Sequence, residues 1–168
     1  MNRRKRHVRL LTAATALVVP LTGCGMGGPP ARVSDLIEGQ YPPLNEGDTH
    51  DVPVELTITN ADPRDHVWIN SFLQVSVEDS RDLTRTVLTD TSQALAPEPD
   101  NRGLDVAPAL TCDDAEHPTC TADLVLRIEA TTGPVATGRW LMTAVLQAEG
   151  AGDDLPDGAT IGIRATDP

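Results

Sequence analysis

The chain contains few aromatic residues and almost no lysine. Its 168 residues include two Trp, one Tyr and one Phe, and its single lysine is Lys5. A sugar-binding platform needs several exposed aromatic rings, so this composition does not favour one. Trp68 and Trp140 are expected to fill a hydrophobic core instead, because large rings contribute most when they are buried.

Positive charge is also scarce. Five of the 13 basic residues and none of the 25 acids precede Cys24. The chain from Cys24 onward therefore has eight Arg against 25 acids, a formal net charge of −17. Such an excess repels the phosphates of nucleic acids and anionic lipids, and it argues against nucleic acid as a partner. The composition is also typical of a GC-rich genome, which explains the acidity without a cation-binding function.

The sequence lacks the short motifs of common enzyme classes. It has no Gly-x-Ser-x-Gly, no His-Glu-x-x-His and no phosphate-binding loop. His50 and His66 each adjoin an Asp, but a catalytic triad is defined by its geometry and not by adjacency in the chain. We therefore predict a protein that is not an enzyme, with no cofactor and no identifiable small-molecule substrate.

No apolar run is long enough for a permanent transmembrane helix. The longest, Leu10 to Leu21, has about a dozen residues, whereas a spanning helix needs about 20. It follows a basic segment and ends at small residues, which is the pattern of a signal peptide. The basic segment contains Arg3, Arg4, Lys5, Arg6 and Arg9. Its Arg3-Arg4 pair also permits twin-arginine export, although a plain basic run explains it equally well.

The stretch Leu21-Thr22-Gly23-Cys24 follows this apolar segment. An aliphatic residue, two small residues and a cysteine resemble the lipobox of bacterial lipoproteins, and the GC-rich composition is typical of an actinobacterial one. The resemblance implies cleavage before Cys24 and a diacylglyceryl group, with palmitate-type chains, on its sulfur. Two acyl chains would anchor the protein stably to the outer face of the cell membrane. Ordinary secretion with an incidental cysteine is the alternative.

Three segments follow from this interpretation. Residues 1–23 form the signal peptide. Residues 24–51 carry the lipidated cysteine and a tether rich in Gly and Pro. Residues 52–168 form the folded ectodomain, which is long enough for one domain with a sizeable core.

The ectodomain shows the alternation of half-buried strands. Val52, Val54, Leu56 and Ile58 alternate with polar residues and with Pro53, which predicts a strand. Pro53 favours the edge of a sheet or the start of a strand. Residues 137–148 fit helical spacing as well as strand spacing, and we favour a strand because the neighbouring segments are strands. Seven strands are predicted, at 52–59, 66–78, 84–89, 104–110, 122–130, 137–148 and 161–163.

These strands predict an all-β fold, an antiparallel immunoglobulin-like β-sandwich of about seven strands. A small β-barrel is the structural alternative. The stretch from Val52, with the Asn60-Ala61-Asp62-Pro63 turn and a strand bearing Trp68, resembles immunoglobulin-like bacterial surface domains. It lacks the Cys–Trp–Cys arrangement of true immunoglobulin domains. No site residue follows from this resemblance.

Two cysteines remain once Cys24 is assigned to the anchor. An exported chain meets an oxidising environment, so Cys112 and Cys120 are expected to form a disulfide. Cys120 shares the parity of Leu124 and Leu126, so its side chain should point into the core. Seven residues separate the two cysteines, which does not match a Cys-x-x-Cys redox motif, and two thiols alone do not make a zinc site.

Acidic residues in two loops are the candidates for a metal site. Calcium binds six to eight oxygen ligands from flexible loops, but neither loop matches an EF-hand. The candidate ligands are Asp113, Asp114 and Glu116 in the disulfide loop and Asp153, Asp154 and Asp157 near the C-terminus. Copper is disfavoured, because the soft ligands do not cluster: they are Met26, Met142, His50, His66 and His117.

The sequence therefore predicts a membrane-anchored extracytoplasmic lipoprotein that acts as a non-enzymatic accessory or interaction module. Its partners would be the membrane, through Cys24, and a protein at the cell surface. The alternative is a surface lipoprotein that binds calcium or another ligand.

Overall fold

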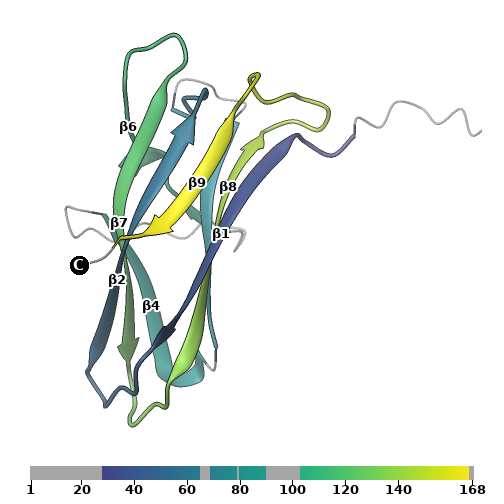
Figure 1. The fold of residues 1–168 in the computed structure, drawn as a ribbon. Helices are drawn as coiled ribbons and strands as arrows, with labels where there is room; N and C mark the ends of the chain where they lie inside the picture. Colours follow the sequence, from purple (N-terminus) through teal and green to yellow (C-terminus); the bar gives the residue numbers. More distant parts are fainter. Residues whose placement is uncertain (1–27, 65–68, 79, 90–102, 167–168) are drawn as a thin grey trace, which may run out of the picture.

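The computed structural model describes residues 28–64, 69–78, 80–89 and 103–166 (Figure 1). Within these ranges the chain forms nine strands and two single-turn 3-10 helices, η1 and η2, and no α-helix. The elements are β1 Arg32–Tyr41, β2 Thr49–Thr59, β3 Ile69–Val77, η1 Ser80–Asp82, β4 Leu83–Thr89, β5 Leu104–Asp105, η2 Ala107–Ala109, β6 Thr111–Cys112, β7 Thr119–Ala130, β8 Gly138–Ala148 and β9 Thr160–Ala165.

The strands form two antiparallel sheets. One sheet has the order β1-β8-β3-β5, and the other has the order β4-β7-β2-β9. The short strand β6 pairs with the first residues of β7, on the same edge of β7 as β4. The predicted all-β, antiparallel β-sandwich is confirmed. The two strands beyond the seven predicted ones are β1 and β6.

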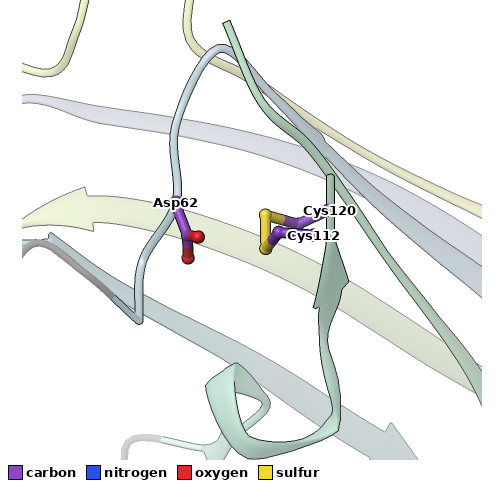
Figure 2. Close-up of side chains that lie close together, drawn as sticks. All are labelled: Asp62, Cys112 and Cys120. Carbon is purple, nitrogen blue, oxygen red and sulfur yellow. A yellow bond between two sulfur atoms is a disulfide. The ribbon is translucent and has the colours of Figure 1, made fainter. Parts of the chain in front are cut away.

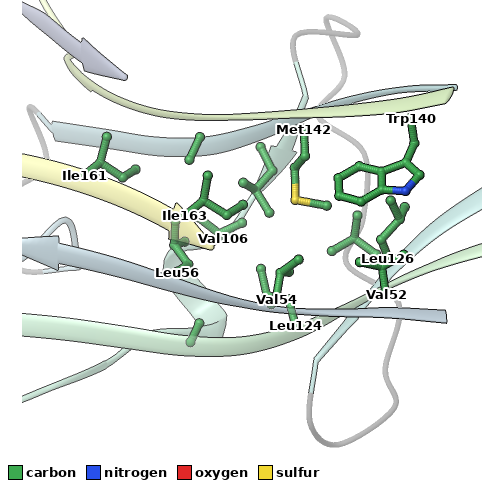
Figure 3. Close-up of a cluster of buried hydrophobic side chains, with 14 of the residues drawn as sticks. Val52, Val54, Leu56, Val106, Leu124, Leu126, Trp140, Met142, Ile161 and Ile163 are labelled. Atoms are coloured by element: carbon green, nitrogen blue, oxygen red, sulfur yellow. The ribbon is translucent and has the colours of Figure 1, made fainter. Parts of the chain in front are cut away.

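The core lies between the two sheets and is lined by the alternating residues of β2, β7 and β8 (Figure 3). Both β2 and β7 alternate buried and exposed or half-buried positions, as the sequence predicts. In β8 the strand prediction is confirmed over the helical alternative. Its inward residues Trp140, Met142, Ala144 and Leu146 are all buried.

Strand β1 lies in the segment that the sequence analysis assigns to the tether. Its ten residues pair with β8 from Arg32 opposite Gln147 to Tyr41 opposite Gly138. The first described strand of the sandwich thus begins twenty residues before the predicted boundary at 52. Tyr41 is buried, and its hydroxyl donates a hydrogen bond to the Glu78 carbonyl at 3.1 Å.

Pro53 does not mark an edge strand. Strand β2 is interior, because it pairs with β7 on one side and with β9 on the other. The β2–β9 ladder begins at Val54, so the proline nitrogen, which has no hydrogen to donate, falls just outside it. The Pro53 carbonyl accepts the Thr166 N–H at 2.9 Å.

The segment 104–110 is shorter as a strand than the sequence predicts. Only Leu104 and Asp105 pair, at the edge of their sheet beside β3. Pro108 lies in η2, where its missing N–H is tolerated. The predicted start of the 66–78 strand, including Trp68, and the predicted loop over 91–101 lie outside the described residues.

Candidate functional site

The proposed anchor precedes the described part of the structure. The predicted signal peptide 1–23 and Cys24 lie outside the described residues. The first backbone contacts of the domain are at Ala31, whose N–H donates to the Asp153 carbonyl at 3.3 Å and whose carbonyl accepts the Ala148 N–H at 2.9 Å. Among the residues that the structure describes, no helix has the length and hydrophobicity needed to cross a bilayer.

The predicted disulfide between Cys112 and Cys120 is present (Figure 2). The two cysteines are register partners of β6 and β7, with their Cα atoms 3.9 Å apart. The bridge therefore joins neighbouring strands of one sheet and not the two layers. Cys120 is fully buried and points inward, as its parity predicts, and its sulfur lies 3.5 Å from the Ala61 carbonyl oxygen. A disulfide sulfur has no hydrogen, so this is a packing contact.

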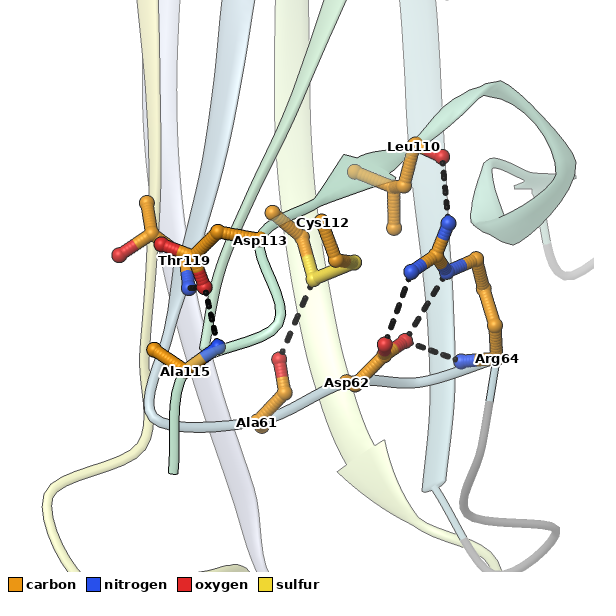
Figure 4. Close-up of a disulfide and its surroundings, with 9 residues drawn as sticks. Ala61, Asp62, Arg64, Leu110, Cys112, Asp113, Ala115 and Thr119 are labelled. Atoms are coloured by element: carbon orange, nitrogen blue, oxygen red, sulfur yellow. Dashed lines mark hydrogen bonds and ion pairs between the residues drawn. A yellow bond between two sulfur atoms is a disulfide. The ribbon is translucent and has the colours of Figure 1, made fainter. Parts of the chain in front are cut away.

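An ion pair between the buried Asp62 and the partly exposed Arg64 lies beside the disulfide and was not predicted from the sequence (Figure 4). Asp62 Oδ1 accepts hydrogen bonds from the backbone N–H and the Nε of Arg64, at 2.9 and 3.1 Å. Arg64 Nη2 contacts Asp62 Oδ2 at 2.9 Å, and Nη1 donates to the Leu110 carbonyl at 3.3 Å. The signal in the sequence is the Asp at the turn, because Asp side chains accept the backbone N–H two residues on. The contact of Arg64 with the Leu110 carbonyl could not be predicted in this way, because Leu110 is distant in the chain.

Asp62 and the two cysteines place three potential ligand atoms within 4.8 Å of one another (Figure 2). This group is not suited to a metal ion, because a metal needs free thiolates and these sulfurs are bonded to each other. The Asp62 carboxylate is already paired with Arg64. The arrangement fastens the turn after β2 to the start of β7.

The six calcium candidates do not converge. Across the described ranges, none of them belongs to a group of three or more His, Cys, Asp or Glu residues with ligand atoms that close together. Asp113 Oδ1 instead accepts the backbone N–H groups of Thr119 and Ala115, at 3.0 and 3.4 Å, and so orders its own loop. Asp114 and Glu116 are exposed. With Asp62, Arg64, Asp113, Ala115 and Pro118 they line an open cavity of about 340 Å³.

The second acidic loop joins β8 to β9. Asp153, Asp154 and Asp157 are all exposed. The remaining candidate ligands are scattered: Met142 is in the core, His50 lies on β2, and His117 is exposed in the disulfide loop. Met26 and His66 lie outside the described residues.

Arginines form cross-strand ion pairs on the outer faces of the sheets. Arg127 donates to Asp51 through Nε at 2.8 Å and through Nη2 at 2.6 Å. This hydrogen bonding lowers the pKa of Asp51 and raises the pKa of Arg127. Arg164 pairs through Nη2 with Glu55, directly opposite it, at 2.8 Å. Both pairs are largely exposed, so each contributes little to stability.

Comparison with known proteins adds no family. No protein-family model, no curated protein and no solved structure matches this chain.

Proposed function

We propose that the chain is a lipoprotein held on the outer face of the cell membrane by acyl chains on Cys24. The observation that carries the proposal is the order of basic segment, short apolar segment and Leu21-Thr22-Gly23-Cys24 at the N-terminus. Every element that the structure describes lies downstream of Cys24, which is compatible with removal of residues 1–23.

The sandwich itself is proposed to act as a non-enzymatic accessory or interaction module. The absence of short catalytic motifs supports this. So does the structural role of the polar side chains that make the most hydrogen bonds and ion pairs. Asp62, Arg64 and Asp113 hold loops in place, and the arginines on the sheets pair with neighbouring carboxylates. Capture of membrane proteins with the lipidated chain would identify the partner.

The anchor is tested by Cys24→Ala in the full chain, expressed in a bacterial host. The variant should leave the membrane fraction or accumulate as an uncleaved precursor, because no sulfur is available for acylation. Mass spectrometry of the wild type should find cleavage after Gly23 and a diacylglyceryl group on Cys24. Met26→Ala, two residues downstream, is the control and should fractionate like the wild type. If Cys24→Ala does so too, and Cys24 carries no lipid, the proposal is wrong.

A further inference from the structure

The anchor and the fold together determine which end of the sandwich is closest to the bilayer. Only six residues separate Cys24 from Ala31, where the backbone is already hydrogen-bonded to Ala148 and Asp153. An extended chain spans at most about 3.6 Å per residue, so Ala31 lies within about 25 Å of the acylated cysteine. This distance is shorter than the sandwich, because an eleven-residue strand such as β2 is about 35 Å long.

The anchored end carries both acidic loops (Figure 1). Residues 149–159 follow β8, whose last residues pair with the beginning of β1. The disulfide loop 113–118 lies at the same end, because Thr59 is opposite both Thr119 of β7 and Thr160 of β9. Asn60 joins the two loops: its N–H donates to the Pro118 carbonyl at 2.8 Å, and its Nδ2 donates to the Gly158 carbonyl at 3.0 Å.

The opposite end includes residues 42–48, 78, 80–82 and 131–137, which lie at the other ends of the same strands. Their backbones are tied together by a bridge between Leu44 and Val135 and by the Thr131 N–H, which donates to the Asp82 carbonyl at 2.9 Å. In a chain anchored at Cys24, the end that carries the two acidic loops is therefore nearer the lipid. The opposite end could reach the lipid only if the whole domain turned over beside its anchor.

We propose that the end formed by segments 60–64, 113–118 and 149–159 faces the lipid surface, and that its acids hold it off an anionic bilayer. The opposite end, with residues 42–48, 78, 80–82 and 131–137, is then presented outward. This orientation rests on the anchor proposed above. Like charges repel across roughly one Debye length, about 10 Å at 0.1 M salt. The separation from the bilayer therefore depends on the lipid charge and on ionic strength.

The orientation is tested with the chain from Cys24 to Pro168, which contains every described element. Cys112 and Cys120 are bonded to each other, so Cys24 is the free thiol and can be coupled to a maleimide lipid in zwitterionic nanodiscs. A gadolinium-chelating lipid then broadens the NMR signals of amides near the headgroups. Signals of 113–118 and 150–158 should be lost, and those of 45–48 and 131–137 retained.

Loss of the second set instead, or equal broadening of both sets, would overturn the orientation. Because the lipid is attached chemically, this result does not depend on whether cells acylate Cys24. A failed orientation and a failed anchor are therefore distinguishable.

The electrostatic part is tested in nanodiscs with anionic lipid at low salt, where broadening of 113–118 and 150–158 should be weaker than in zwitterionic discs. In the anionic discs, high salt should restore the broadening of these signals. Neutralising the β8–β9 loop by Asp153→Asn, Asp154→Asn and Asp157→Asn should restore it too. The matched control neutralises three acids at the opposite end by Glu46→Gln, Glu78→Gln and Asp82→Asn, and should restore nothing. Equal broadening in both lipids, or equal restoration by the control, would contradict the repulsion.

Discussion

At the scale of single residues, two aromatic rings lie over two glycines between β1 and β8. Gly39 is the register partner of Trp140, and Gly138 is the register partner of Tyr41. A Cβ atom added to either glycine would overlap the ring that covers it. Glycine weakens a strand by itself, but here it makes room for the two largest side chains of this strand pair. Trp140 is 5% exposed and Tyr41 is 2% exposed.

Replacing Gly39 by alanine should therefore destabilise the domain, although alanine is normally the better strand residue. We expect a loss of about 1–3 kcal/mol in the free energy of unfolding, because the added methyl group must displace the Trp140 ring. Urea unfolding, followed by tryptophan fluorescence, measures it. Gly28→Ala is the control, since nothing lies within 4 Å of its added Cβ, and its effect should stay within about 0.5 kcal/mol. Equal stability of the two variants would contradict the packing argument.

At the scale of elements, the sequence predicts those strands whose inward residues are uniformly apolar. The alternation is unbroken in β7 and in β2 from Val52 on, and in β8 the buried Val145 interrupts it. The existence and the inward face of all three strands are predicted correctly. Strand β1 differs because the positions that share the parity of its core-packed residues Val33 and Ile37 include Gly39 and the exposed Asp35. Gly39 is explained only by Trp140, about a hundred residues away. Asp35 Oδ2 accepts the Ile163 N–H of β9 at 3.0 Å, so the polar residue connects the two sheets where hydropathy predicts a tether.

Strand β6 was missed for a different reason. Its two residues are too short for any periodicity, and only the pairing of Cys112 with Cys120 gives them a register. Cysteine chemistry predicts the bridge, but it does not reveal that the bridge joins adjacent strands. The ion pair of Asp62 and Arg64 beside the bridge also depends on the tertiary position of Leu110, whose carbonyl accepts a hydrogen bond from Arg64, and no local pattern contains that position.

Removing the disulfide should weaken the β6–β7 connection without unfolding the domain. The variant with both Cys112→Ala and Cys120→Ala should lose about 2–3 kcal/mol, the loop-closure entropy of a ring this short. Urea unfolding measures the loss. The matched control is Thr111→Ala with Thr121→Ala, the exposed register pair next to the disulfide, which should cost less than about 1 kcal/mol. Equal costs for the two double variants would show that the bridge adds nothing beyond an ordinary strand pair.

At the scale of the whole molecule, the acids that the structure describes are spread over the surface and do not gather into a metal site. Among the described residues, Arg64, Arg127, Arg139 and Arg164 form ion pairs with carboxylates, and the 25 acids after Cys24 far outnumber the eight arginines there. The sequence could show which loops are acidic. It could not show whether their carboxylates converge, because convergence depends on how two loops fold against each other. Within the described residues the six candidates do not meet as ligands of one ion.

Salt should therefore stabilise this domain through its net charge, and calcium should have no special effect. Self-repulsion of a chain with a charge of −17 destabilises the compact state, and screening by any electrolyte relieves it. Melting temperatures in NaCl and CaCl₂, matched in ionic strength, should rise equally. A true calcium site, at ten times its Kd, would add about 1.4 kcal/mol through binding to the folded state alone. A larger rise in calcium that disappears in the variant with both Asp153→Asn and Asp154→Asn would establish that site and favour the ligand-binding alternative.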